Sequence, residues 1–165
     1  MLRPEFALPT AGNGERVAAR IATQFMIRYC MALAKLGGGD LVRGLILATT
    51  LEANVRHLQP PSEEGHTLAS RDAVPPDTAR KPISVSAVAR ALSLPYETTR
   101  RHINKLLKEG ACVRVQDQGV IVPAAYVSDQ KEITEMQYVG LRKMLGTLYA
   151  AGFDLEGMAR GELAG

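Results

Sequence analysis

A proline divides residues 82–123 into short elements. Ser93-Leu94-Pro95 interrupts a stretch whose pattern is otherwise helical. Because proline is excluded from a helix interior but accepted at its start, the sequence predicts a turn here and a new helix opening at Pro95 or Tyr96. Ser84 is a suitable N-cap for the short helix before the turn, and Gly110 ends the helix after it. The segment is therefore predicted to form two short helices joined by a tight turn.

Two β-rich runs follow these helices. Residues 111–115 and 120–122 are rich in valine and isoleucine, and Gln116-Asp117-Gln118-Gly119 between them has the composition of a turn. A hairpin placed directly after the second helix is a wing. The expected fold class is mainly α, a winged helix-turn-helix with a small two-stranded β wing and flanking N- and C-terminal helices.

The second of the two helices has an apolar and a basic side. With 3.6 residues per turn, one side collects Tyr96, Thr99, Ile103, Leu106 and Leu107. The opposite side collects Glu97, Thr98, Arg101, Lys105 and Lys108. Residues 80–118 hold eight basic and three acidic residues, a net charge of +5, so the remainder of this +3 chain carries −2. A polyanion is therefore expected to bind here.

The same stretch resembles the winged helix-turn-helix segments of bacterial transcription regulators such as the GntR, IclR and MarR families. The resemblance covers about a quarter of the chain, and Thr99 and His102 stand where those families usually place an apolar residue. The residues that carry it are Val88-Ala89 with Leu92 and Leu94, Thr98-Thr99-Arg100-Arg101, and Leu106-Leu107 with Glu109-Gly110 leading into Val113. It implies a transcriptional regulator that binds double-stranded DNA sequence-specifically as a homodimer.

Seven residues are predicted to contact DNA. Thr98, Arg101 and Lys105 would face the major groove, and Glu97 would accept a hydrogen bond from a cytosine amino group. Phosphates would be held by Arg100, Lys108 and Arg114. His102 lies at the flank of the apolar side, where we expect a core-edge histidine that makes one hydrogen bond.

Two other functions were weighed. Winged helices also serve as protein-interaction or scaffold modules without DNA binding, and the apolar N-terminal helices would then dock a partner. An enzyme is disfavoured, because the sequence has no nucleophile elbow, no P-loop and no HExxH motif. We therefore expect no catalytic residue, no metal site and no cofactor, and we leave open a small-molecule effector among the N-terminal helices.

The flanking segments are predicted to be helical and to support dimerisation. A helix from about Glu15 is ended by Gly37-Gly38-Gly39, Asp40 caps a second helix from Leu41 to about Leu58, and Ser128 caps a last helix that runs to about Ala151. We divide the chain into residues 1–58, an N-terminal helical pair for dimerisation or core support; 59–81, a flexible linker; 82–123, the DNA-binding unit; and 124–165, a C-terminal helix and tail for dimerisation.

The location of the protein is predicted from its apolar runs and cysteines. The first residues lack the basic and apolar regions of a secretory signal. The most apolar window, residues 17–36, carries Arg20, Arg28 and Lys35, which argues against a membrane helix. Cys30 and Cys112 lie in apolar surroundings and are expected to be buried thiols. The sequence therefore predicts a cytoplasmic protein without a membrane partner.

Overall fold

The structure is a computed structural model that describes residues 13–58 and 73–156. In this part the chain is mainly helical and contains one two-stranded antiparallel sheet, which confirms the coarse fold class. The chain forms two compact units. One comprises Met1–Ala32 with Thr134–Gly165, and the other comprises Leu33–Ile133. We call them the helix-pair unit and the central unit.

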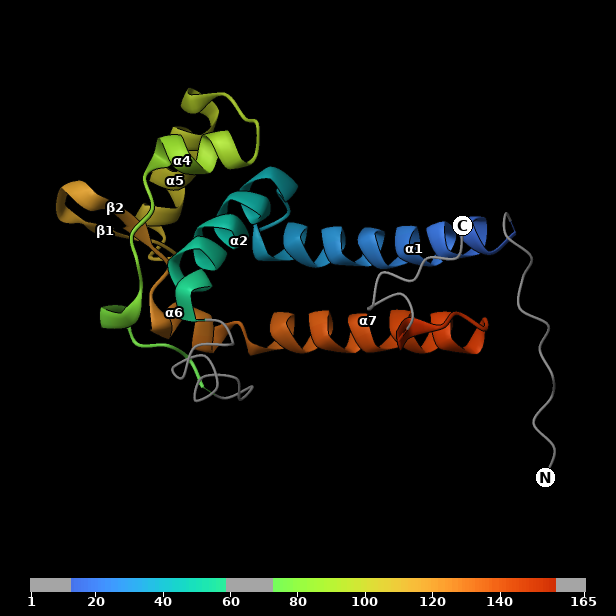
Figure 1. The fold of residues 1–165 in the computed structure, drawn as a ribbon. Helices are drawn as coiled ribbons and strands as arrows, with labels where there is room; N and C mark the ends of the chain where they lie inside the picture. The colour runs from blue at the N-terminus through green and yellow to red at the C-terminus, as the bar shows by residue number, and fades with distance from the viewer. Residues whose placement is uncertain (1–12, 59–72, 157–165) are drawn as a thin grey trace. The chain divides into compact units, whose positions relative to one another are not determined.

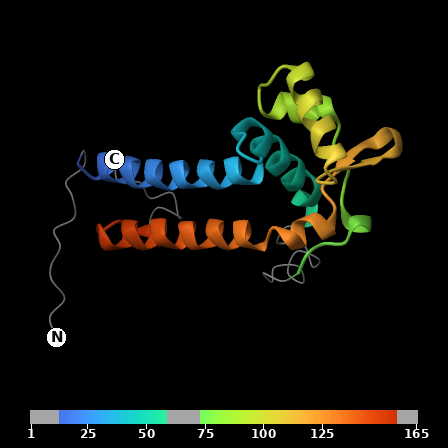
Figure 2. The ribbon, with the colours of Figure 1, turned by 180° about the vertical axis from the view of Figure 1, so that it is seen from behind.

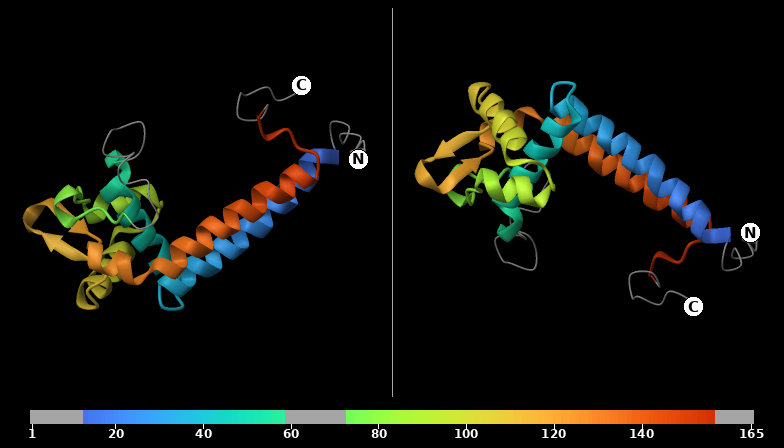
Figure 3. Two further views of the ribbon diagram at one scale, coloured as in Figure 1. Left: turned by 90° about the horizontal axis from the view of Figure 1, so that it is seen from below. Right: turned by 90° about the horizontal axis from the view of Figure 1, so that it is seen from above.

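The helix-pair unit consists of two long antiparallel helices. They are α1 (Asn13–Leu36) and α7 (Lys131–Ala150), whose last and first few residues respectively belong to the central unit. The two helices lie side by side (Figures 1 and 3). Phe25 of α1 faces Gly140 of α7, where a Cβ atom would lie 3.5 Å from the phenyl ring. A methyl group at this position would meet the phenyl ring in ordinary van der Waals contact.

The central unit combines short helices with a β ribbon (Figure 2). The helices are α2 (Leu41–Val55), α4 (Val85–Ala91), α5 (Tyr96–Lys108) and α6 (Ala124–Asp129), with 3₁₀ turns at Arg56–Leu58, Asp77–Ala79 and Gln116–Gln118. The strands β1 (Val113–Val115) and β2 (Gly119–Ile121) pair with Arg114 opposite Val120. Ile83, just before α4, adds an isolated antiparallel bridge to Val120.

An aliphatic core joins these elements. It is formed by buried residues of α2, α4, α5 and the ribbon: Ile46, Leu47, Val88, Ile103, Leu106, Ala111, Cys112, Val120 and Val122. From the sequence, α2 is expected to pair with the first helix. In the structure α2 contributes Ile46 and Leu47 to the core that it shares with α4 and α5, because its apolar side is wide enough to contact both of these helices.

A buried asparagine fastens α2 to the ribbon. Asn54 is fully buried, and its side-chain amide donates to the Lys81 carbonyl at 2.7 Å and to the Val120 carbonyl at 3.2 Å. Its Oδ1 accepts from the Val122 backbone N–H at 2.9 Å. One polar side chain therefore bonds backbone groups of the segment that precedes α4 and of the segment that follows α5. Asn54 was not singled out from the sequence.

The predicted helix caps are confirmed at two positions. Asp40 Oδ1 accepts from the Arg43 N–H at 3.1 Å, and Ser84 Oγ accepts from the Ala87 N–H at 3.2 Å. Gly110 has a φ of +74°, the left-handed conformation that glycine adopts at a helix end. The helix start expected at Pro95 or Tyr96 is also confirmed, since α5 begins at Tyr96.

One predicted boundary is wrong, and another holds with a change of helix type. Ser128 does not cap the last helix but lies inside α6, where its hydroxyl donates to the Ala124 carbonyl at 3.0 Å. The helix is interrupted at Gln130, and α7 begins at Lys131. The helix expected from Leu41 to about Leu58 is α-helical to Val55 and continues as a 3₁₀ turn over Arg56–Leu58. Local hydrogen bonds of this kind compete with helix ends.

Both cysteines are free thiols, but only one is fully buried. Cys112 is 1% exposed, and burial raises its pKa to about 12. It is therefore unreactive at neutral pH, because the thiolate is the nucleophile. Cys30 is only partly buried, which differs from the expectation of two buried thiols.

The Asp40 cap gives a pH-dependent stability. The Arg43 N–H, followed by the nearby His102, lowers the pKa of Asp40 below its usual 3.8. A carboxyl whose pKa is lower in the folded state stabilises the fold above the unfolded-state pKa, and this contribution is lost as pH falls through the folded-state pKa. We expect Asp40→Ala to lower the free energy of unfolding by about 1 kcal/mol at pH 7.

Urea unfolding at pH 7 and at about pH 2.5 measures this effect. The difference between the two proteins should shrink as the pH falls through the folded-state pKa of Asp40, because the wild-type carboxylate loses its charge over that range. Asp40→Asn, which keeps the capping oxygen without a titrating group, should retain most of the stability at both pH values. A deficit in Asp40→Ala that is equal at both pH values would contradict the expected role of the charge.

Candidate nucleic-acid interface

Helix α5 separates buried from exposed side chains as its sequence pattern predicts. Thr99, Ile103 and Leu106 are fully buried on its inner side. The predicted DNA-contacting residues of α5 lie elsewhere on it: Thr98 is half-buried, and Glu97, Arg100, Arg101, Lys105 and Lys108 are exposed. The helix is thus fixed by one side and leaves its basic side open.

Two polar residues lie at the inner edge of α5, and only one of them forms a side-chain hydrogen bond. The Thr99 hydroxyl donates to the Pro95 carbonyl at 3.2 Å, which satisfies a polar group inside the core. His102 Nδ1 lies 3.6 Å from Asp40 Oδ2, a distance that fits an ion pair when the ring is protonated and is too long for the hydrogen bond expected from the sequence. His102 is a core-edge residue, with its side chain 13% exposed.

An ion pair fixes the end of α5 to the start of α2. The Arg43 guanidinium pairs with the Glu109 carboxylate, which follows the last turn of α5. The Arg43 side chain is 20% exposed, so solvent screens this pair less than a pair on the open surface. Together with the contact between His102 and Asp40, it sets the direction in which α5 leaves the core.

Glu97 and Arg100 engage each other. The Arg100 Nη2 and Nε atoms donate to Glu97 Oε2 at 2.7 and 3.0 Å. The hydrogen bond from Arg100 lowers the pKa of Glu97, and the same bond raises the pKa of Arg100. The sequence predicts separate DNA contacts for these two residues, whereas in this structure they form one surface ion pair. Their three-residue spacing on a helix is the signal that predicts such a pair.

Four predicted contact residues remain unpaired cations. Within residues 13–58 and 73–156, no ion pair or side-chain hydrogen bond involves Arg101, Lys105, Lys108 or Arg114. The spacing of three and four residues places Thr98, Arg101, Lys105 and Lys108 in one stripe along α5. Arg114 is exposed on β1, the strand that follows α5. We call the three unpaired cations of α5, Arg101, Lys105 and Lys108, the basic stripe.

One basic residue counted from the sequence is not available to a ligand. The Arg80 side chain is fully buried, donates from Nη2 to the Pro75 carbonyl at 2.9 Å, and lies 3.5 Å from Asp77. Burial lowers its pKa. Arg80 therefore holds the segment before α4 and does not contribute to an external positive field.

Comparison of the chain with protein-family models, with curated proteins and with solved structures gives no match. The described residues contain no cluster of histidine, cysteine, aspartate or glutamate that could hold a metal ion. In that same part of the chain, no helix is both long enough and apolar enough to cross a bilayer. The basic stripe is the feature of the central unit with the clearest ligand chemistry.

Proposed function

We propose that the chain is a transcriptional regulator that binds double-stranded DNA sequence-specifically, as a homodimer and by non-covalent contacts alone. The central unit would act as a winged helix-turn-helix, with α4 and α5 as its two helices and the β1–β2 ribbon as its wing. The observation that carries the proposal is the basic stripe, unpaired and exposed on a helix whose opposite side is buried. A rigid helix with this surface suits the major groove.

The turn between α4 and α5 supports this proposal. Ser93 has a φ of +52°, and the Leu94 N–H donates to the Ala89 carbonyl at 2.9 Å, so the chain reverses within a few residues. Ala89 is 5% exposed, and its small side chain lets the two helices approach closely. These are the requirements of a helix-turn-helix pair. Arg101, Lys105 and Thr98 would read bases, and Lys108 and Arg114 would hold phosphates.

A row of exposed apolar residues on α7 supports the homodimer. Tyr138, Leu141, Leu145 and Tyr149 are 56%, 41%, 39% and 72% exposed. Their spacing of three and four residues places them on the side of α7 opposite Gly140, which faces α1. We call this row the α7 stripe. Continuous exposed apolar surface of this kind marks an interface, and a second copy pairing through α7 would give the two-fold symmetry of a palindromic DNA site.

Substitutions in the basic stripe test the proposal. Selection from a random duplex pool first supplies the preferred site, which is expected to be an inverted repeat. Arg101→Ala should then weaken binding to that site by about 1 to 3 kcal/mol and leave random duplex less affected. Lys108→Ala should weaken binding to both duplexes alike. It should also reduce the slope of the logarithm of the binding constant against the logarithm of salt concentration by about one unit. Equal losses on both duplexes for Arg101→Ala would contradict its base-reading role.

A protein-interaction module is the second candidate, and exposed residues of α1 favour it. Met26, Ile27 and Met31 are 62%, 56% and 67% exposed, so α1 also offers apolar surface to a partner. Retention on immobilised duplex DNA separates the two functions. A DNA-binding protein elutes at a salt concentration that falls when Arg101 and Lys105 are replaced by alanine. Elution that does not respond to these replacements would favour the interaction module.

A further inference from the structure

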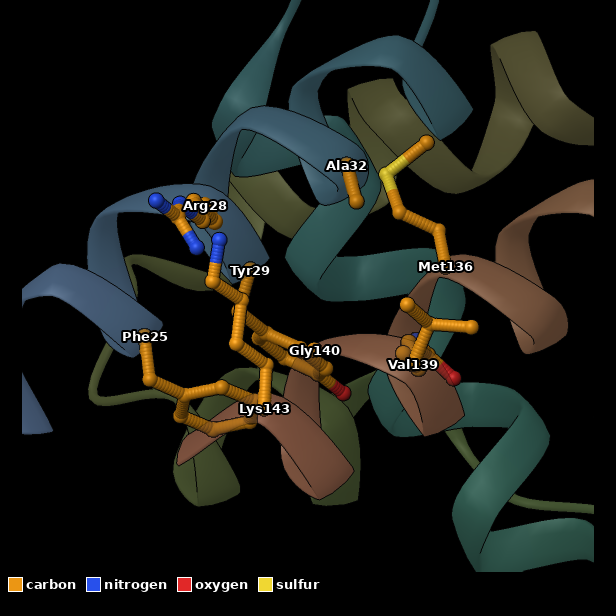
Figure 4. Close-up of a pocket in the computed structure, with 9 residues that line it drawn as sticks. Phe25, Arg28, Tyr29, Ala32, Met136, Val139, Gly140 and Lys143 are labelled. Carbon is orange, nitrogen blue, oxygen red and sulfur yellow. The ribbon is translucent and has the colours of Figure 1, made fainter. Parts of the chain in front are cut away.

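A pocket of about 280 Å³ opens between the two helices of the helix-pair unit (Figure 4). Phe25, Tyr29 and Ala32 of α1 line it together with Met136 and Val139 of α7. Its floor is accessible because Gly140 carries no side chain where α7 passes Phe25. The volume is at the small end of the range for ligand sites, which is roughly 300 to 1,000 Å³. It suits a single ring or a short alkyl chain.

Two cations border this apolar surface. Arg28 and Lys143 line the pocket from α1 and α7, and Figure 4 shows both side chains on the same side of it. Neither side chain forms an ion pair or a hydrogen bond with any other residue that the structure describes. None of the described residues that line the pocket is acidic. Two like charges beside a common apolar surface repel each other, and a bound anion would remove this repulsion.

We propose that this pocket binds a small amphipathic carboxylate, a medium-chain fatty acid or an aromatic acid, with its apolar part against Phe25 and Met136 and its carboxylate between Arg28 and Lys143. The apolar walls supply hydrophobic burial, and the paired cations select an anion over a neutral or cationic molecule of the same shape. A ligand there contacts both helices at once. It therefore stabilises their antiparallel pairing by mass action.

The pocket lies on a different part of α7 from the α7 stripe. Met136, Gly140 and Lys143 recur at helical spacing on the side near α1, whereas the α7 stripe lies opposite Gly140. A second copy bound to the α7 stripe would leave the pocket available. Ligand binding is measured without DNA, so its failure and a failure of DNA binding are separate results.

Calorimetric titration of the full chain with octanoate tests the proposal, with octanamide and octylammonium as neutral and cationic molecules of equal chain length. Octanoate should bind about tenfold more tightly than octanamide, since each exposed ion pair contributes up to about 1 kcal/mol. Octylammonium should bind more weakly than either. The double variant Arg28→Gln/Lys143→Gln should reduce the affinity for octanoate to that for octanamide.

Matched variants make the result specific to the pocket. Arg20→Gln/Arg142→Gln removes the same two charges from α1 and α7 outside the pocket lining and should leave octanoate binding unchanged. Gly140→Leu, which fills the pocket, should abolish binding of octanoate and octanamide, and a helical circular dichroism spectrum verifies that this variant is folded. Gly140→Ala adds a methyl group at an ordinary 3.5 Å from Phe25 and should retain binding.

Three outcomes would overturn the proposal. The first is equal affinity for octanoate and octanamide, which would show that the cations do not select the ligand. The second is an equal loss of octanoate binding in the pocket and control charge variants. The third is absence of octanoate binding together with a change in sedimentation of Arg28→Gln/Lys143→Gln, which would assign the pocket to a second copy of the chain.

Discussion

Leu145→Glu is expected to convert the proposed dimer to a monomer and to lower the affinity for a two-fold DNA site by about a hundredfold or more. Leu145 lies in the centre of the α7 stripe, between Leu141 and Tyr149. A glutamate there would place a charge in the apolar interface of the proposed dimer, and like charges from the two copies would meet. The loss in DNA affinity follows because two linked half-site contacts become one, and linkage is worth about 10² to 10⁴ in affinity.

Sedimentation velocity and binding to the selected inverted repeat measure this result. Ala150→Glu places the same charge on an exposed position of α7 outside the stripe and should leave both the mass and the affinity unchanged. Binding of Leu145→Glu to an isolated half-site should match that of the wild type, because the basic stripe is untouched. A Leu145→Glu protein that remains a dimer would place the dimer interface elsewhere.

Asn54→Leu is expected to lower the free energy of unfolding by about 1 to 3 kcal/mol, the cost of leaving one buried polar group unpaired. The leucine removes the donor to the Lys81 carbonyl and the acceptor of the Val122 N–H. The Val120 carbonyl keeps its bond from the Ile83 N–H. One buried and one partly buried backbone group therefore lose the partners that Asn54 provides, in a domain class whose total stability is about 5 to 15 kcal/mol.

Urea unfolding followed by circular dichroism tests the Asn54 prediction. Glu52→Ala, on the same helix, breaks a surface ion pair with Arg56 whose partners are 45% and 71% exposed. Such pairs contribute about 0 to 1 kcal/mol, so this control should lose less stability than Asn54→Leu. If the two variants unfold at the same urea concentration, the hydrogen bonds of Asn54 do not hold the ribbon to α2.

The elements of the central unit could be predicted from the sequence because their signals are local. Ser84 and Asp40 cap helices by accepting from residues three positions away, and Pro95 excludes the preceding residues from α5 by its own ring. The inner side of α5 follows from helical periodicity alone. Ser128 shows the limit of such signals, since its hydroxyl bonds back to Ala124 instead of capping the next helix.

The features that the sequence did not reveal depend on tertiary contacts. Arg80 counts as a surface charge in any sequence tally, and only the folded chain encloses it against Pro75 and Asp77. Asn54 reaches across 68 positions to Val122, and no pattern in one sequence marks such a pair. The pocket arises because α1 and α7, which are distant in the chain, lie side by side.

The ion pair between Glu97 and Arg100 has a consequence for selectivity under the proposed function. A phosphate that recruits Arg100 must first displace a carboxylate bound at 2.7 Å. An incidental polyanion therefore gains less from this arginine by the contribution of the broken pair, which is small for a pair as exposed as this one. At a site where a cytosine amino group donates a hydrogen bond to the released Glu97 carboxylate, this new contact compensates for the broken ion pair. The same two side chains would therefore weaken non-specific binding of polyanions relative to binding of the cognate DNA sequence.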